Sequence, residues 1–423
     1  IQKQYKIFLK KHRIVKEREQ EENKMLQGKT VLLGVTGGIA AYKMPNVARM
    51  LKKMHCNVHV LMTQNATNFI TATTFETLTG NKCLIDTFDR NFEFSVEHVA
   101  LAKQADLVLL APATANVIGK IANGIADDML TTTVMACTCK VLVAPAMNHN
   151  MYHNSIVQEN LEKLKRHGYE MIDPVCGMLA NGDTGDGKLP SEETLVEYVL
   201  RELAFEKDMQ GLKVLVTAGP TQEAIDPVRF ISNYSTGKMG YAIAKNAMLR
   251  GAEVTLVTGR TALEPPMFVK TVPVTSAKDM YQAVMECAKE QDIIVKAAAV
   301  ADYTPAHTAD EKIKKSEGEL SLALEKTTDI LAELGKNKGN TVLCGFSMET
   351  EHMLENSRAK RKKKNLDMIA ANNLKQQGAG FAGDTNVLTL ITEDWEKELA
   401  LMSKDEAAKC LLDELLKIKK NKK

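Results

Sequence analysis

The chain has 423 residues, of which 44% are hydrophobic and 26% are charged, a mixture that suits globular domains and excludes a disordered or entirely coiled-coil protein. Its length predicts two domains rather than one. The formal net charge is +2, but residues 1–24 and 417–423 hold a surplus of nine positive charges, which leaves about −7 on the rest and argues against a broad nucleic-acid-binding face.

The ends and the cysteines carry little specific chemistry. Residues 1–24 are expected to form a basic N-terminal extension outside the fold. No stretch approaches the roughly 18 uninterrupted apolar residues of a membrane helix, so we expect no membrane partner. The eight cysteines are scattered, and the pair in Cys137-Thr138-Cys139 has no second cluster at metal-site spacing, so they predict reduced thiols in a cytoplasmic protein.

The first half alternates short apolar runs with helical patterns. The runs are KTVLLGVT (29–36), VHVLMT (58–63), ADLVLLAP (105–112) and KVLVAPAM (140–147). Apolar strands separated by helices indicate βα units around a parallel sheet that is buried on both faces. We therefore predict a doubly wound α/β domain over residues 25–190.

The same pattern restarts after a charged helical stretch. The apolar runs there are KVLVTAG (213–219), GAEVTLVTG (251–259), QDIIVKAAAV (291–300), NTVLCGFS (340–347) and LDMIAANN (366–373). We expect a linker at residues 191–210 and a second domain over 211–423. The fold class is α/β, with two doubly wound Rossmann-like domains in series.

Polar residues and glycines follow several strands of the first domain. They are Thr36-Gly37-Gly38-Ile39-Ala40, Thr63, Pro112-Ala113-Thr114-Ala115-Asn116 and Pro145-Ala146-Met147-Asn148. Ligands of such sheets bind beyond the carboxyl ends of the strands, so this set suits a neutral heterocycle with its phosphate. A plain βα turn remains the alternative for the glycine segment. His98, before the helical VALAKQA, is either a capping histidine or a base near neutral pH.

Three blocks of the first domain resemble a known family. TGGIAAYK (36–43), HVALAKQADLVLLAPATANVIGKIANGIADD (98–128) and PAMNHNMY (145–152) resemble the flavin-dependent cysteine decarboxylases, and most closely the decarboxylase half of bifunctional coenzyme A biosynthesis proteins. The resemblance implies a flavodoxin-like domain that decarboxylates phosphopantothenoylcysteine, with FMN at a trimer interface. It implies that His98 is the base and that Asn148 holds the substrate carboxylate. The implied FMN contacts are Gly37, Gly38, Ile39, Ala40, Thr63, Thr114 and Asn116.

One position departs from that family. The substrate flap usually reads ACGDxGxG, with its cysteine as the final proton donor, whereas this chain reads LANGDTGDG (179–187) with Asn181 at that position. An amide cannot donate a proton at a useful pKa. The alternative is therefore an active second domain joined to an impaired or scaffold-only flavin domain. A regulatory flavin-binding subunit and a flavin prenyltransferase are further, weaker alternatives.

The second domain carries a different set of motifs. TAGPTQEAIDPVRFISNYSTGKMG (217–240) runs from a strand to a helix and can form an anion cradle. KAAAVADY (296–303) ends another strand with small residues that let a flat base approach the backbone. EKIKK (311–315) and RAKRKKKN (358–365) are basic, and each can equally be a solvated face. Lys360 and Lys364 are four residues apart and share one helix face.

These blocks resemble the phosphopantothenate–cysteine ligase half of the same family. The resemblance implies CTP as the activating nucleotide and Mg2+ as its partner. It also implies that 4'-phosphopantothenate is first joined to CMP as an acyl-cytidylate, from which the amine of cysteine displaces CMP. It implies that Asn233 stabilises the intermediate, that Arg229 belongs to the same substrate loop, and that Lys312 reaches the α-phosphate of a neighbouring subunit. The implied CTP contacts are Lys296, Ala297, Ala298, Asp302, Lys312, Thr328, Asp329, Ile330, Leu331, Phe346, Lys360 and Lys364. The metal ligands stay unassigned.

Two residues depart mildly from the ligase pattern, Thr328 where proline is frequent and Met348 where alanine is common. Shared flavin and lysine sites imply a homo-oligomer, a dodecamer of trimeric flavin domains and dimeric ligase domains. The expected partners are small-molecule substrates and no nucleic acid.

Overall fold

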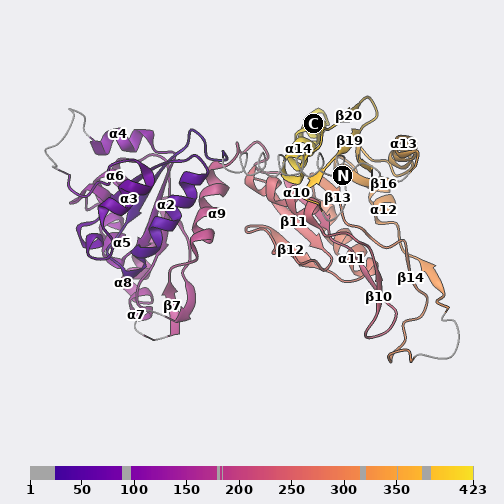
Figure 1. Ribbon diagram of the computed structural model, residues 1–423, viewed down its shortest axis with the longest axis horizontal. Coiled ribbons are helices and arrows are strands. Elements are labelled where there is room, and N and C mark those ends of the chain that lie inside the picture. Colours follow the sequence, from indigo (N-terminus) through magenta and orange to yellow (C-terminus); the bar gives the residue numbers. More distant parts are fainter. Residues whose placement is uncertain are drawn as a thin grey trace, which may run out of the picture. The chain divides into compact units, whose positions relative to one another are not determined.

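The computed structural model describes residues 24–87, 97–178, 182, 184–314, 321–349, 351–373 and 383–422. The chain forms two compact units that divide between Phe205 and Glu206, and each is described by itself. Figure 1 shows both as α/β units in which helices flank a central sheet. Residues 1–23 of the expected extension and Asn181 lie outside the described residues.

The first unit contains a five-stranded sheet in which every neighbouring pair is parallel. Its order is β2-β1-β3-β4-β5, which is that of flavodoxin-like folds. The strands are β1 (Thr30–Val35), β2 (Asn57–Met62), β3 (Leu107–Ala113), β4 (Lys140–Pro145) and β5 (Glu170–Met171). Every residue of β1 and β3 is buried, as expected for central strands covered on both faces. The four predicted strands and the doubly wound fold are confirmed.

Helices cover both faces of this sheet (Figure 1). One group consists of α2 (Met44–Lys53), α3 (Ala72–Thr79) and α9 (Glu192–Leu203), with α2 in contact with the other two. The other group consists of α4 (Glu97–Gln104), α5 (Ala115–Ala122), α6 (Met129–Ala136) and α8 (Ser155–Arg166). Leu32, Leu110 and Leu130 belong to the apolar core between the sheet and this second group.

The expected linker over residues 191–210 is wrong for most of its length. Residues 192–203 form α9, which begins at a Ser191 cap and buries Leu195, Val196, Val199 and Leu200. This helix packs on α2 and β3, so it belongs to the first unit. The charged residues of this stretch form the solvent-facing side of an amphipathic helix. Composition alone does not distinguish such a helix from a linker.

Short elements complete the first unit. They are the 3-10 helices η1 (Ile39–Lys43) and η2 (Gln64–Asn68), the one-turn helix α7 (His149–Tyr152), and the antiparallel strands β6 (Val175–Met178) and β7 (Thr184–Lys188). The backbone N–H of Met147 donates to the carbonyl of Gly187 at 3.0 Å. The β6–β7 hairpin is thereby fastened to the end of β4.

The second unit has an eight-stranded sheet of order β12-β11-β8-β13-β16-β17-β19-β20. Its strands are β8 (Lys213–Ala218), β11 (Glu253–Thr258), β12 (Lys270–Pro273), β13 (Ile293–Lys296), β16 (Val342–Glu349), β17 (Met368–Asn373), β19 (Leu388–Ile391) and β20 (Glu396–Glu398). The first six are mutually parallel in Rossmann order, whereas β19 and β20 add an antiparallel edge that the sequence reasoning did not anticipate.

Helices again occupy both faces. On one face, α10 (Lys238–Leu249) contacts β8 and β11 and packs on the last helix, α14 (Lys404–Asn421). On the other lie α11 (Ala277–Cys287), α12 (Ile330–Lys336) and α13 (Met353–Lys363). Small elements are η3 (Ala288–Glu290) and the strand pairs β9 (Gln222–Ala224) with β10 (Phe230–Ser232), β14 (Tyr303–Pro305) with β15 (Leu324–Lys326), and β18 (Thr385–Asn386) with β21 (Met402–Ser403).

Gly240 lets α10 lie directly against β8. A Cβ atom at this position would stand 2.6 Å from the Cβ of Ala218 and 2.9 Å from the carbonyl oxygen of Thr217. The missing side chain therefore brings the start of α10 close to the end of β8. Within the described residues, we find no helix that combines the length and the apolar character needed to span a membrane.

Candidate functional site

The clearest concave site lies in the second unit, beyond the carboxyl ends of β8, β13, β16 and β17. It is a pocket of about 480 Å³ at the crevice between β8 and β13, where the strand order reverses. Its lining includes eleven of the twelve residues expected to contact CTP, namely Lys296, Ala297, Ala298, Asp302, Thr328, Asp329, Ile330, Leu331, Phe346, Lys360 and Lys364. Asn233 and the loop 235–240 line it as well.

Small residues after β13 form one wall, and hydroxyl groups at and just beyond the end of β8 hold them in place. The backbone N–H of Ala298 donates to Thr217 Oγ1 at 3.1 Å, and that of Ala301 donates to Thr221 Oγ1 at 3.0 Å. The Asn233 side-chain amide donates to the Ala299 carbonyl at 3.0 Å. These hydrogen bonds fix the backbone of residues 298–301, whose small side chains leave that backbone accessible from the pocket.

Three of the five lysines that line the pocket, Lys296, Lys360 and Lys364, lie close together. Burial first, and then the nearby ammonium groups of Lys364 and Lys360, lower the pKa of Lys296 to about 8. The pKa of Lys360 is lowered by the same two causes, burial first and then Lys364. Cations gathered against their own repulsion and desolvation are the expected arrangement for binding a polyanion.

One carboxylate partly balances this charge. Lys364 Nζ lies 2.8 Å from Asp329 Oδ2, and Asp329 also accepts a hydrogen bond from the backbone N–H of Ala332 at the start of α12. Burial alone would raise the pKa of Asp329, but the Lys364 and Ala332 interactions outweigh it and the net shift is downward. Asp329 therefore orients Lys364 rather than offering a free carboxylate.

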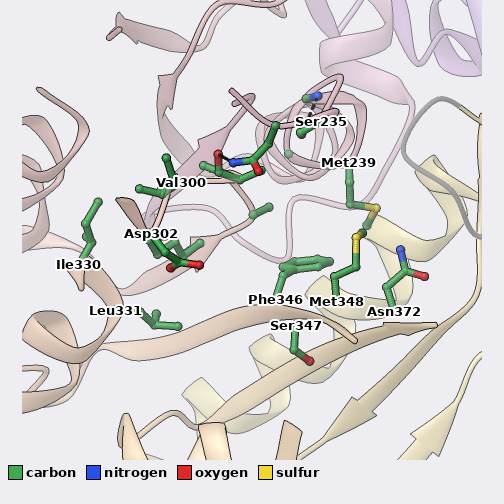
Figure 2. Close-up of a pocket in the computed structure, with 18 of the residues that line it drawn as sticks. Ser235, Met239, Val300, Asp302, Ile330, Leu331, Phe346, Ser347, Met348 and Asn372 are labelled. Atoms are coloured by element: carbon green, nitrogen blue, oxygen red, sulfur yellow. Dashed lines mark hydrogen bonds between the residues drawn. The ribbon is translucent and has the colours of Figure 1, made fainter. Parts of the chain in front are cut away.

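Apolar and polar side chains face each other across the pocket. Figure 2 shows the Asp302 carboxylate pointing into the cavity, with the Phe346 ring and the Met239 and Met348 side chains lining it from other elements. The Met348 departure noted in the sequence thus supplies an apolar lining atom.

The loop end of the pocket contains a lysine that sequence reasoning missed. Lys404, the first residue of α14, is buried at 7% exposure and donates to the Gly383 carbonyl. Burial, and then the nearby Lys238, lower its pKa to about 8. Lys238 itself pairs with Asp384 at 2.8 Å. A sequence signal for its burial exists, because Lys404 directly follows the helix cap Ser403 and lies on the buried face of α14.

Arg229 and Lys312 are not among the described residues that line this pocket. Arg229 pairs with the buried Asp226 and donates to the backbone carbonyl of Ile313 at 2.8 Å. The guanidinium of Arg229 is thus engaged with Asp226 and Ile313, and its expected role toward substrate stays a prediction. Lys312 is exposed beside that contact.

The strand ends of the first unit bring several of the expected flavin residues to one edge. Thr36 Oγ1 donates to the Pro112 carbonyl at 2.6 Å and accepts the backbone N–H of Thr114 at 3.0 Å. These bonds join the ends of β1 and β3, the point where the strand order reverses. The backbone N–H of Ala146 donates to the Ala113 carbonyl at 3.0 Å, which brings the segment containing Asn148 beside this edge.

This edge fits a flavin phosphate and ring. Thr63 is 8% exposed, and its hydroxyl oxygen has no hydrogen-bond partner among the described residues. A Cβ atom at Gly37 would stand 2.5 Å from the Cβ of Asn65, so the backbone there lies bare and close to η2. A ligand phosphate at this edge could accept a hydrogen bond from the buried Thr63 hydroxyl and approach the backbone at Gly37.

The remaining first-unit candidates take less central places. Gly38 and Ala40 are partly buried, and Ile39 and Asn116 are exposed. His98 lies in the first turn of α4 and is partly buried, and no contact described for it reaches the strand-end edge. Asn148 caps α7, where its side chain accepts the Asn150 backbone N–H at 2.9 Å.

Comparison with known proteins assigns both units. The family profile described as "Flavoprotein" matches residues 19–204, and "DNA/pantothenate metabolism flavoprotein C-terminal domain" matches residues 209–418. The coenzyme A biosynthesis bifunctional protein CoaBC of Bacillus subtilis is 45% identical over 94% of this chain and 98% of its own length, and that of Haemophilus influenzae is 42% identical over 92% and 98%. The crystal structure of the C-terminal domain of a CoaBC protein has 41% identity and a TM-score of 0.45, covering 51% of this chain and all of its own. This chain therefore belongs to the family of bifunctional coenzyme A biosynthesis proteins.

Proposed function

We propose that the second unit joins 4'-phosphopantothenate to cysteine at the expense of CTP, and that the first unit decarboxylates the product with FMN. The observation that carries the ligase half is the pocket in which Lys296, Lys360 and Lys364 face Phe346 and a bare alanine segment. A triphosphate suits the lysines, and a pyrimidine suits the flat wall.

The ligase chemistry needs charge stabilisation more than acid–base catalysis. The phosphopantothenate carboxylate would attack the α-phosphorus of CTP, releasing pyrophosphate and leaving an acyl-cytidylate. The amine of cysteine then displaces CMP and forms the amide. Asn233, held on the Ala299 carbonyl, stands at the pocket wall to orient the acyl group, and the three lysines offset the negative charge on the phosphates.

Mg2+ fits this pocket as a partner of the triphosphate. Asp302 presents a carboxylate to the cavity, whereas Asp329 is paired with Lys364. A single protein carboxylate plus phosphate oxygens is the usual environment of nucleotide-bound Mg2+. We therefore assign Asp302 to the metal side of the nucleotide.

In the first unit, the edge formed by Gly37, Thr63 and Thr114 would hold FMN, which supplies a two-electron acceptor for the thiol-bearing carbon of the substrate when bound. Asn148 would hold the carboxylate that leaves as CO2. His98 would take the proton released on the thiol side.

A homo-oligomer would complete both sites. Ile39 and Tyr42, beside the proposed flavin edge, are 55% and 60% exposed, and a neighbouring subunit would cover them. Lys312 lies outside the pocket of its own unit, so a neighbouring subunit would have to supply it. We propose the trimer-and-dimer dodecamer on these two grounds.

Asn181 supports a second candidate, an active ligase with an impaired flavin domain. The family's flap cysteine supplies the last proton, and an asparagine amide does not. In that case phosphopantothenoylcysteine would accumulate while CMP is still released.

The test separates the two halves. Purified full-length protein receives 4'-phosphopantothenate, cysteine, CTP and Mg2+ in one reaction, and phosphopantothenoylcysteine alone in another, with products followed by mass spectrometry. Phosphopantetheine in both supports the full proposal. Accumulation of phosphopantothenoylcysteine, relieved in an Asn181→Cys variant, supports the second candidate. Folded protein that releases no CMP would overturn the ligase assignment.

A further inference from the structure

Two histidines and an aspartate converge in the first unit, next to Asn148 and on the flap strand β7, and the proposed reactions give none of the three a role. His149 and His153 lie four residues apart on and just after α7, and Asp186 lies on β7. One ligand atom from each, a ring nitrogen or a carboxylate oxygen, lies within 4.8 Å of the other two. We propose that this cluster binds a divalent transition-metal ion of the zinc class.

The side chains already face one another. His153 Nε2 lies 3.2 Å from Asp186 Oδ2, and the two imidazole rings are tilted by 59° with centroids 4.4 Å apart. The backbone N–H of Asp186 donates to His149 Nδ1 at 3.2 Å, so the lone pair of that nitrogen points toward β7. An ion between the three would replace this long hydrogen bond with a shorter coordinate bond.

The backbone holds the two elements together without the ion. Gly187 pairs with Met147, and its missing side chain is required because a Cβ there would stand 2.2 Å from the Met147 carbonyl oxygen. On the other side of Asp186, a Cβ at Gly185 would stand 2.8 Å from His149 Nδ1. Asp186 is thus fixed between two contacts with the segment 147–149, and the site is largely formed before a ligand arrives.

The donor set selects the kind of ion. Imidazole nitrogens favour Zn2+, Ni2+, Co2+ and Cu2+, whereas Mg2+ and Ca2+ require mostly oxygen ligands. Two histidines and one carboxylate leave a fourth position for water, as in many three-ligand zinc sites. His153 and Asp186 are about half exposed, at 49% and 44% of their side chains, so an ion can enter directly from solvent.

The test measures Zn2+ binding to the full-length flavoprotein, purified without a histidine tag and stripped of metal by a chelator. Calorimetry should show one Zn2+ site that weakens at least tenfold in His153→Gln and in Asp186→Asn. His167→Gln, which changes an exposed histidine after α8, is the matched control and should leave the affinity unchanged.

Co2+ serves as the second probe because the chain also has eight cysteines. Bound Co2+ should show visible ligand-field bands without sulfur-to-cobalt charge transfer. His149→Gln should abolish those bands, with the retained flavin spectrum as the check on folding. Absence of Zn2+ binding, equal affinity in wild type and both half-exposed variants, or a thiolate spectrum would each overturn the proposal.

Discussion

Arg229 donates a hydrogen bond to the backbone carbonyl of Ile313, and Asp226 accepts the Ile313 N–H at 3.2 Å. The same carboxylate accepts the backbone N–H groups of Val228 and Arg229 at 2.8 Å each. A buried aspartate and its arginine thus hold the residue that directly follows Lys312. We therefore expect this pair to position the segment that contains Lys312 for the ligase reaction.

Asp226→Asn should therefore lower ligase turnover by tenfold or more, because the amide loses the ion pair with Arg229 and weakens the hold on Ile313. The decarboxylation of supplied phosphopantothenoylcysteine should stay at the wild-type rate, since the change lies in the other unit. Steady-state rates for the two reactions on one preparation check this. Equal loss in both reactions would indicate a folding defect instead.

The contribution of the Asp226–Arg229 pair to the free energy of unfolding should not change between pH 7 and pH 5. The Arg229 guanidinium is the main cause that holds the pKa of Asp226 well below its usual range, aided by backbone N–H groups and opposed by burial. A carboxyl whose folded pKa is depressed stabilises the fold fully above its unfolded pKa, here near 3.8, and loses that effect as pH falls toward the folded value. Denaturant unfolding at pH 5 and pH 7 should show no change in the difference between wild type and Asp226→Asn.

Lys364→Met should weaken CTP binding about tenfold or more, since a charge-assisted contact is worth about 1.5–3 kcal/mol. It also leaves Asp329 without its 2.8 Å partner, which adds negative charge beside the phosphates. The double variant Lys364→Met with Asp329→Ala should recover part of the affinity. A binding titration with CTP measures both, and an unchanged affinity in Lys364→Met would remove this lysine from the nucleotide site.

CTP binding should take up protons at pH 8.5. Lys296 has a pKa lowered to about 8 in the free protein, chiefly by burial, so at this pH most molecules carry it neutral. The triphosphate would favour the charged form and raise the pKa, so affinity should fall as pH rises above 8. Calorimetry in two buffers of different ionisation enthalpy reports the protons directly. In Lys296→Met the proton uptake should be smaller, and what remains would come from Lys404, whose pKa is also about 8.

Thr63→Val should weaken FMN binding about threefold to tenfold, the effect of losing one hydrogen bond of 0.5–1.5 kcal/mol. Its hydroxyl has no partner among the described residues, so the flavin-free protein should be as stable or slightly more stable. Fluorescence titration with FMN and thermal unfolding of the flavin-free protein check the two halves of this expectation. Unchanged FMN affinity would place the phosphate away from Thr63.

The sequence allowed the central parallel strands of both sheets to be predicted for one physical reason, whereas most pocket residues were implied by the family resemblance. Parallel strands bring their carboxyl ends to one edge, so residues at the ends of apolar runs, such as Thr36 and Thr114, meet in space. Position along the chain does not show which way a side chain is hydrogen-bonded. The contacts of Arg229 with Asp226 and Ile313 were thus not foreseen, and Lys404 went unnoticed because a lysine on a helix is ordinarily solvated.

The place of Lys404 has a consequence for how the protein is made. The pocket takes residues from the loop after β8 and from the first turn of the last helix, α14. During synthesis its lining therefore cannot be completed until the start of α14 has left the ribosome. The first unit ends at Phe205 and can fold much earlier, since domains fold in order of synthesis. Nascent chains should acquire a flavin fold before they can hold a nucleotide.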